Sequence, residues 1–94
     1  MKVIIKRPGF KAEYAEIENS LSKLQEIVGG YIETVTFTSD ACLIVNEEGR
    51  LKGLPYNFNF CGLQIFRSVI FVGVKGDEFT DFPGKIETLF GGGE

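Results

Sequence analysis

Two nearly continuous apolar runs dominate the pattern of hydrophobic and polar positions along the chain. Residues 41–45 read Ala-Cys-Leu-Ile-Val, and residues 69–74 read Val-Ile-Phe-Val-Gly-Val. Runs of this kind, without polar alternation, are typical of central strands that other parts of the chain cover. Residues 31–38 alternate instead, as expected for a strand with two unlike faces. The turn residues 38–40 between the first run and this strand predict an antiparallel hairpin.

Three shorter segments complete the set of predicted strands. Residues 2–6 end at the turn signal Arg7-Pro8-Gly9, and residues 14–18 alternate over a short length. Residues 56–60 read Tyr-Asn-Phe-Asn-Phe, so an extended backbone places three rings on one face and two asparagines on the other. We expect this aromatic face to point into the core, with an exposed recognition patch as the alternative. Residues 62–68 show no pattern that predicts a helix or a strand.

The sequence predicts one helix near residues 20–28. Asn19 or Ser20 supplies a side chain that can cap its first turn, and Gly29 supplies the left-handed residue that ends a helix at little steric cost. The apolar positions within the helix form a single stripe, which is expected to face a sheet. They are Leu21, Leu24, Ile27 and Val28.

A second, short helix is expected near residues 82–90, at the C-terminal end. Asp81 is a suitable N-cap residue, and Pro83 is tolerated in a first helical turn. The apolar residues of this segment recur at helical spacing. They are Phe82, Ile86, Leu89 and Phe90.

This mixture of elements predicts an α+β fold with a mainly antiparallel sheet of about five or six strands. With 94 residues the chain is long enough for one core and too short for two, so we expect one globular domain over residues 1–90 and a flexible tail over residues 91–94. An apolar content of 44% and a charged content of 24% predict an ordered chain. The net charge of −3 argues mildly against general nucleic-acid binding, which usually needs a basic balance.

Basic residues concentrate at the start of the chain. Four of the ten fall within the first eleven positions, at Lys2, Lys6, Arg7 and Lys11. We interpret this segment as an edge strand that its lysines keep soluble. A small phosphate-contacting patch is the alternative.

Neither the apolar runs nor the cysteines point to a membrane or an oxidising compartment. No run approaches the roughly 18 apolar residues of a membrane helix, and the first residues do not read as a signal peptide. Cys42 and Cys61 lie within apolar stretches and lack Cys-x-x-Cys spacing. We therefore expect two buried thiols in a cytoplasmic protein, with a disulfide or a metal site as the alternative.

The composition offers little for catalysis. The chain has no histidine, so the commonest general base and metal ligand is missing, and a Ser-His or Cys-His nucleophile cannot be built. Glu47 and Glu48 are adjacent in a predicted turn, where we expect their side chains to diverge into water. The acidic residues between 77 and 81 lack the number and spacing of a calcium loop. We expect no enzyme, no catalytic residue, no cofactor and no metal.

Four segments together resemble one family, described as domain of unknown function 3846, whose members are small proteins of bacteria, phages and mobile elements. The segments are residues 24–33 (Leu-Gln-Glu-Ile-Val-Gly-Gly-Tyr-Ile-Glu), 45–51 (Val-Asn-Glu-Glu-Gly-Arg-Leu), 53–57 (Gly-Leu-Pro-Tyr-Asn), and 69–73 (Val-Ile-Phe-Val-Gly) with 76–79 (Gly-Asp-Glu-Phe). Similar proteins often carry a glycine just before the late apolar strand, where this chain has Phe66-Arg67-Ser68. The resemblance implies a compact stand-alone domain and a mobile-element setting, and it transfers no catalytic residue.

The leading hypothesis is a protein-interaction module that uses loop residues held on a rigid sheet. Its candidate surface consists of Asn46, Glu47, Gly49, Tyr56, Asn57 and Asn59. The first alternative is a weak binder of single-stranded nucleic acid, with the basic start on phosphates and aromatic rings stacked on bases. The second is a structural homodimer that forms by edge-strand pairing or through an exposed aromatic face.

Overall fold

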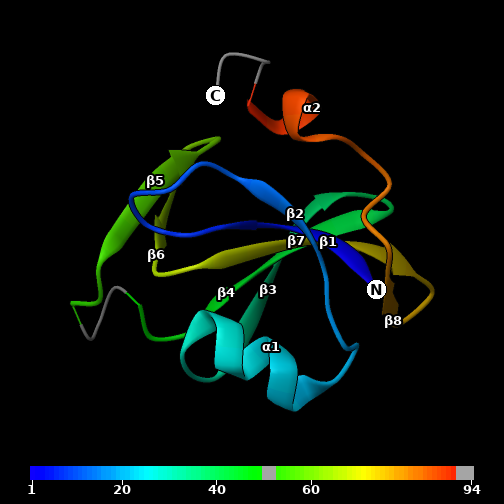
Figure 1. Cartoon of the computed structure of the whole chain (residues 1–94), viewed down its shortest axis with the longest axis horizontal. Coiled ribbons are helices and arrows are strands. Elements are labelled where there is room, and N and C mark those ends of the chain that lie inside the picture. Colours follow the sequence, from blue (N-terminus) through cyan, green and yellow to red (C-terminus); the bar gives the residue numbers. More distant parts are fainter. Residues whose placement is uncertain (50–52, 91–94) are drawn as a thin grey trace.

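The computed structural model describes residues 1–49 and 53–90, which form eight strands and two helices (Figure 1). In chain order these are β1 (Lys2–Lys6), β2 (Glu13–Glu16), α1 (Leu21–Val28), β3 (Ile32–Thr38), β4 (Ala41–Asn46), β5 (Tyr56–Phe60), β6 (Leu63–Phe66), β7 (Val69–Lys75), β8 (Glu78–Thr80) and α2 (Ile86–Phe90). The predicted α+β class and antiparallel sheet are confirmed. No helix within these residues is long and apolar enough to span a membrane.

A six-stranded antiparallel sheet forms the middle of the molecule. Its strand order is β2-β1-β7-β4-β3, and β8 pairs with the end of β7. The predicted hairpin is confirmed, since β3 pairs with β4 in antiparallel register. Strands β5 and β6 form a separate two-stranded hairpin. The strands β2 and β3 are therefore the two ends of this strand order, and the short β8 is paired with β7 alone.

One face of the sheet is covered by α1, which lies across it in Figure 1. The N-cap is Ser20, whose hydroxyl accepts from the Lys23 backbone N–H at 3.2 Å. Gly29 ends the helix in the left-handed region at φ 84°, as predicted. The helix buries Leu24 and Val28 against the sheet, which is the expected stripe. Leu21 is an exception, because it lies in the first turn at the margin of this contact and is 58% exposed.

The other face is covered by the β5–β6 hairpin and by α2. Phe60 is buried there, and its ring meets the Phe71 ring edge-on at 5.4 Å between centroids. Phe90 of α2 closes on the same cluster at 5.9 Å from Phe71. Because both faces of the sheet are covered, β4 is buried at every position, and so are the first five residues of β7. This layering explains the two apolar runs in the sequence.

The aromatic segment is divided between core and surface. Phe60 is buried, Phe58 is half-buried and Tyr56 is 52% exposed. A register irregularity between Tyr56 and Phe58 accompanies this gradient along β5. The expectation of a core-facing aromatic strand is thus confirmed at its end and wrong at its start.

The first strand is not an edge strand. β1 lies between β2 and β7, so it is paired on both sides. Lys6 is only 7% exposed, and its ammonium donates to the Asn57 Oδ1 at 3.0 Å and to the Arg7 carbonyl at 3.2 Å. The same ammonium lies 5.4 Å from the centre of the Phe58 ring. Of the four early basic residues, Lys6 is thus held within the fold, whereas Arg7 is exposed and pairs with Glu13 at 2.6 Å on the surface.

The C-terminal helix is shorter than predicted. It begins at Ile86, whereas residues 82–85 form a connection without regular secondary structure that bends at Gly84. Asp81 does not cap it, because its Oδ1 accepts from the Lys2 backbone N–H at 2.7 Å instead. The sequence also predicts a short strand or extended arm over residues 50–53. Most of this segment, and the flexible tail predicted over residues 91–94, lie outside the described residues.

Two positions show why particular residues stand where they do. Gly73 lies in the middle of β7 against the carbonyl of Asp81, and a Cβ there would overlap that carbonyl. Arg67 joins β6 to β7 with φ at 59°, the left-handed region that glycine favours. Arg67 belongs to the Phe66-Arg67-Ser68 segment, where the family resemblance implies a glycine, and its backbone has a conformation that glycine adopts readily. The Arg67 guanidinium lies against Gly29 at the end of α1.

Candidate functional site

The predicted surface residue Asn46 turns inward at the end of β4. Its Nδ2 donates to the Val28 carbonyl at 3.1 Å, and its Oδ1 accepts from the Glu48 backbone N–H at 2.8 Å. The side chain therefore satisfies a carbonyl in the last turn of α1 that the helix leaves unpaired. Gly30 permits this approach, because a Cβ at that position would overlap the amide. The Asn46 side chain is used inside the fold.

Asn57 has a similar internal role on the opposite side of the sheet. Its Nδ2 donates to the carbonyls of Lys6 and Arg67, both at 2.8 Å, while its Oδ1 accepts from the Lys6 ammonium. One amide thus joins β5 to the ends of β1 and of the β6–β7 connection. Both hydrogen-bonding ends of Asn57 are occupied within the chain.

The remaining predicted surface residues are more open. Glu47 is exposed on the turn after β4, whereas Gly49 is buried where a Cβ would meet the Phe66 side chain. Tyr56 is half-exposed and meets the Phe66 ring edge-on at 5.7 Å. The accessible part of this region therefore consists chiefly of Glu47 and Tyr56.

Asn59 and Cys61 belong to the tip of the β5–β6 hairpin. Cys61 and Gly62 both have positive φ, 51° and 86°, as in the two-residue turns that connect hairpin strands. Exposed Asn59 accepts through its Oδ1 from the Gly62 backbone N–H at 3.0 Å. Cys61 is a free and exposed thiol, so the expectation of two buried thiols is wrong at this position. Its apolar neighbours in sequence belong to the strands, while Cys61 itself forms the turn.

Cys42 follows the expectation. It is a free thiol buried in β4, and burial raises its pKa above the ordinary value of 9.0, because the thiolate is poorly solvated there. Among residues 1–49 and 53–90, no group of three or more cysteine and acidic side chains is arranged to hold a metal ion.

Two hollows flank the Asn46–Gly49 turn. One has a volume of about 360 Å³ and lies at the end of α1, between Gly29, Tyr31 and Leu54. The other has about 220 Å³ and lies between β3 and β6, next to Glu33 and Gln64. The turn that the sequence singled out therefore stands between two concave areas, with Asn46 lining both.

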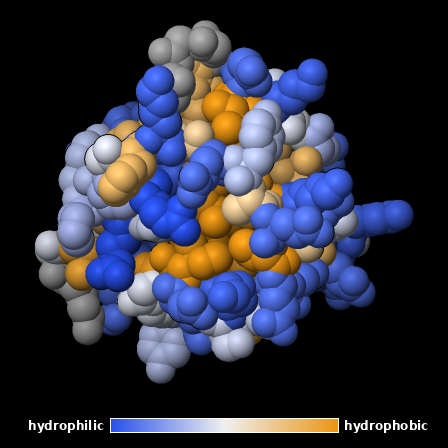
Figure 2. Space-filling view, viewed as in Figure 1, coloured by the Kyte–Doolittle hydropathy of each residue, from blue (hydrophilic) through white to orange (hydrophobic). Residues whose placement is uncertain are grey.

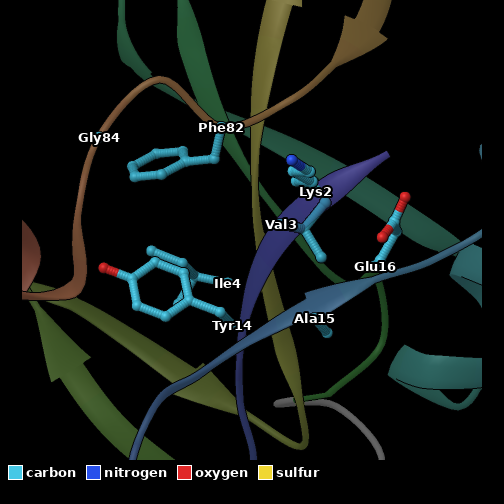
Figure 3. A pocket seen from close by; sticks show the side chains of 8 residues that line it. All are labelled: Lys2, Val3, Ile4, Tyr14, Ala15, Glu16, Phe82 and Gly84. Atoms are coloured by element: carbon cyan, nitrogen blue, oxygen red, sulfur yellow. The ribbon is translucent and has the colours of Figure 1, made fainter.

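The larger groove lies elsewhere, on the sheet face that α2 and the β5–β6 hairpin cover. It has a volume of about 460 Å³ and lies between the β1–β2 pair and the connection that precedes α2. Figure 3 shows the Tyr14 and Phe82 rings on opposite sides of it, with Ile4 beside the Tyr14 ring. Lys2 and Glu16 lie at the far end in the same view. The walls are thus aromatic, and the two charged residues that line the groove, Lys2 and Glu16, lie at one end.

The Tyr14 wall is fixed from its polar end. The hydroxyl of Tyr14 accepts from the Ile86 backbone N–H at 3.0 Å, which ties β2 to the start of α2. The Phe82 wall is fixed by the Phe82 backbone N–H, which donates to the Lys2 carbonyl at 2.8 Å. Both rings are therefore held in place, although Tyr14 remains 61% exposed.

Tyr14 is one of several large apolar side chains that reach the surface. Among residues 1–49 and 53–90, the others with more than a third of their area exposed are Phe10, Leu21, Tyr31, Tyr56 and Leu63. Figure 2 shows an apolar strip across the middle of one face, bordered on both sides by hydrophilic side chains. Apolar surface that is gathered in this way is a common feature of interaction sites.

Comparison with known proteins gives one match. The family model described as Domain of unknown function (DUF3846) matches residues 1–91 of the 94. The chain belongs to this family. Neither the curated proteins nor the solved structures contain a significant match to the chain. The DUF3846 assignment confirms the resemblance inferred from the four sequence segments and brings no activity with it.

Three of the four segments that suggested the DUF3846 family meet around the end of α1. Gly29, Gly30 and Tyr31 face Asn46 and Leu54 across the 360 Å³ hollow. Packing explains the two adjacent glycines, because Gly29 makes room for the Arg67 side chain and Gly30 for the Asn46 side chain. Sequence reasoning missed the larger groove, because Tyr14 and Phe82 are far apart in the chain. A usable signal was the Pro83-Gly84 pair directly after Phe82, which opposes helix formation there.

Proposed function

We propose that this protein is an interaction module that binds an extended segment of another protein along the outer edge of β2. The observation that carries the proposal is an open groove with aromatic walls, directly beside the free edge of β2. The backbone groups of β2 that point away from β1 have no partner among the described residues. An edge strand next to a pocket is the arrangement by which many domains add a peptide strand, with the backbone supplying affinity and the pocket selectivity.

The direction of the backbone groups on β2 follows from its pairing with β1. Met1 and Ile17 exchange both of their hydrogen bonds, each at 2.9 Å. Hydrogen-bonded and non-hydrogen-bonded pairs alternate along an antiparallel ladder. The register therefore makes Val3 and Ala15 a hydrogen-bonded pair and leaves the backbone groups of Tyr14 and Glu16 pointing away from β1. A partner strand would meet these two residues.

The groove supplies a site for one apolar side chain of that segment. Tyr14 and Ile4 lie opposite each other in register, and their side chains are on the same face of the sheet. In an added strand, the residue opposite Tyr14 would place its side chain on this face, at the groove. A volume of 460 Å³ is within the range of ligand pockets and exceeds the needs of one aromatic residue. We therefore assign the anchor as an aromatic or large aliphatic side chain held between Tyr14 and Phe82.

Charge selects the residues that flank the anchor. Glu13, Glu16 and Glu18 are all exposed along β2 and its exit, and only Glu13 has a basic partner, Arg7, within ion-pair distance among the described residues. A segment with lysine or arginine beside its anchor would gain from this arrangement, and an acidic segment would be repelled. Two copies of β2 would also repel each other, so this edge favours a foreign partner.

The proposal makes the protein a binding module and not an enzyme, in keeping with a sequence that has no histidine. Nucleic-acid binding is less well supported, because Lys6 is buried and the exposed Arg7 is ion-paired. Lys2 and Lys11 are then the exposed basic residues of this segment that have no ion pair among the described residues. A cytoplasmic location and a phage or mobile-element setting remain part of the proposal, resting on the sequence. The surface around Glu47 and Tyr56 stays a prediction.

The proposal can be tested by selecting linear peptides from a displayed random library on the immobilised full chain. We expect enriched peptides to share one aromatic or large aliphatic position next to a basic residue. Binding of these peptides should be lost in Tyr14→Ala and Phe82→Ala. The matched control is Tyr31→Ala, because Tyr31 is 68% exposed and lies outside this groove. Enrichment that survives both groove substitutions, or no enrichment at all, would refute the proposal.

A further inference from the structure

The second edge of the sheet, β3, differs from β2 in length and charge. It runs over seven residues, Ile-Glu-Thr-Val-Thr-Phe-Thr, and five of these are β-branched. Glu33 is its one charged residue, and it contains no lysine and no proline. Edge strands of monomeric proteins are commonly protected by short length, charged side chains or proline. The protections of β3 are limited to the single charge of Glu33 and one bulge.

The outward backbone groups of β3 can be assigned from its pairing with β4. The Glu47 N–H donates to the Tyr31 carbonyl at 2.9 Å, next to the Ile32–Asn46 pair of the ladder. Alternation then makes Glu33 and Val35 the residues that bond to β4. The N–H and C=O groups of Ile32, Thr34 and Thr36 point outward. No partner for them occurs among residues 1–49 and 53–90.

We infer that the protein forms a symmetric dimer in solution by antiparallel pairing of β3 with β3 of a second copy. The inference does not depend on the function proposed for the opposite edge. Self-pairing is the simplest use of such an edge, because a two-fold axis presents the same surface to both copies. The sheet would then continue through the dimer from one β2 edge to the other.

The register of the paired strands follows from the regular part of β3. A bulge between Thr36 and Thr38 limits the regular ladder to residues 32–36, whose centre is Thr34. A two-fold axis at this centre places Thr34 opposite Thr34 of the second copy, and Ile32 opposite Thr36. All three outward residues then form hydrogen-bonded pairs, which gives about six backbone hydrogen bonds between the chains.

The side chains are compatible with this register. Thr34 and Thr36 are exposed on the face that carries α1, and threonine pairs across strands are favourable. On the other face Glu33 lies opposite Val35 of the second copy, so the two carboxylates do not meet. Val35 and Phe37 are half-buried against the core, and the added strand would cover more of their area.

The first test is the mass in solution by light scattering or sedimentation. We expect twice the 10.4 kDa of a single chain for the full chain, and the mass of one chain for Thr34→Pro. Proline removes an N–H that this chain does not use internally, a replacement that edge strands tolerate. Thr34→Val is the matched control, because it keeps the N–H and the strand preference and should remain a dimer.

Charged substitutions at Thr34 distinguish loss of the dimer from misfolding of the variant. Thr34→Lys and Thr34→Glu should each be monomeric, because like charges would lie opposite each other at the axis. An equal mixture of the two should form a heterodimer that salt weakens. A monomeric full chain at every concentration would overturn the inference. So would a dimer that persists in all three charged or proline variants.

Discussion

The Nδ2 of Asn46 donates to the Val28 carbonyl at 3.1 Å and so joins the end of the central strand β4 to the last turn of α1. The partner oxygen of the same amide accepts from the Glu48 backbone N–H. One buried side chain therefore fixes both the end of α1 and the start of the turn that follows β4. This contact explains why an asparagine stands at the first position of the Asn-Glu-Glu-Gly segment.

Asn46→Ala should lower the free energy of unfolding by about 1 to 3 kcal/mol, because it leaves a buried carbonyl and a turn N–H without their partner. Asn59→Ala is the control, since Asn59 makes a single hydrogen bond at an exposed turn, and it should cost at most about 1 kcal/mol. Urea unfolding of the three proteins measures both values. Equal costs at the two positions would contradict the structural role assigned to Asn46.

Arg67 is expected to carry backbone strain. Its φ of 59° costs a non-glycine residue about 1 kcal/mol or more. Arg67→Gly and Arg67→Ala both remove the guanidinium that lies against Gly29, but glycine alone relieves the strain. Arg67→Gly should therefore be more stable than Arg67→Ala by about 1 kcal/mol in urea unfolding. An alanine variant at least as stable as the glycine variant would argue against a left-handed residue here.

Gly73→Ala should damage both stability and the groove. The new methyl group would overlap the Asp81 carbonyl and push away the connection that carries Phe82. Overpacking of a close backbone contact typically costs about 1 to 3 kcal/mol. We expect a lower melting temperature together with weaker binding of any peptide selected on the native chain. Gly76→Ala offers a control in a β-hairpin turn where a Cβ meets nothing within 4 Å, although its φ of 65° adds some strain.

The two thiols should react at very different rates. In the native protein a disulfide-exchange reagent should titrate the exposed Cys61 at once and leave Cys42 untouched until the chain unfolds. A count of two reactive thiols in the native state would contradict the burial of Cys42. Cys61→Ser removes the fast phase and assigns it.

The raised pKa of Cys42 also predicts a pH dependence of stability. The unfolded thiol ionises near its ordinary value of 9.0, whereas the buried thiol resists ionisation. The folded state thus binds this proton more tightly, so its contribution to stability is complete below pH 9.0 and is lost as the pH rises through the folded value. The unfolding free energies of the native protein and of the Cys42→Ala variant should therefore diverge above pH 9.0. Parallel curves would contradict the prediction.

Much of the fold could be predicted from local pattern, and the exceptions have physical causes. The apolar runs, the Ser20 and Gly29 caps and the β3–β4 hairpin depend on neighbouring residues, so the sequence shows them. The position of β1 inside the sheet depends on its pairing with β7, some 65 residues away, which no local pattern records. The same applies to Asp81, whose side chain meets the backbone of Lys2 instead of a helix.

The site was harder to predict than the fold for the same reason. From the sequence, Asn46 lies in a predicted turn and Asn57 on the polar face of a predicted strand, so both are expected at the surface. Their hydrogen-bond partners lie in other elements and hold both amides inside the fold. Glu47, Tyr56 and Asn59 are exposed or half-exposed as a surface requires. The groove walls come from two ends of the chain, so neither wall is apparent until the sheet is assembled.

The most direct test of the proposed function is amide hydrogen exchange at β2, measured by NMR with and without the peptide most enriched on the native chain. In the free protein the N–H groups of Tyr14 and Glu16 should exchange fast, and that of Ala15 slowly, because alternation directs only the last toward β1. Peptide binding should slow exchange at Tyr14 and Glu16 and shift the Phe82 resonances. Unchanged exchange at both residues, or changes confined to the Glu47 and Tyr56 region, would contradict binding at this edge.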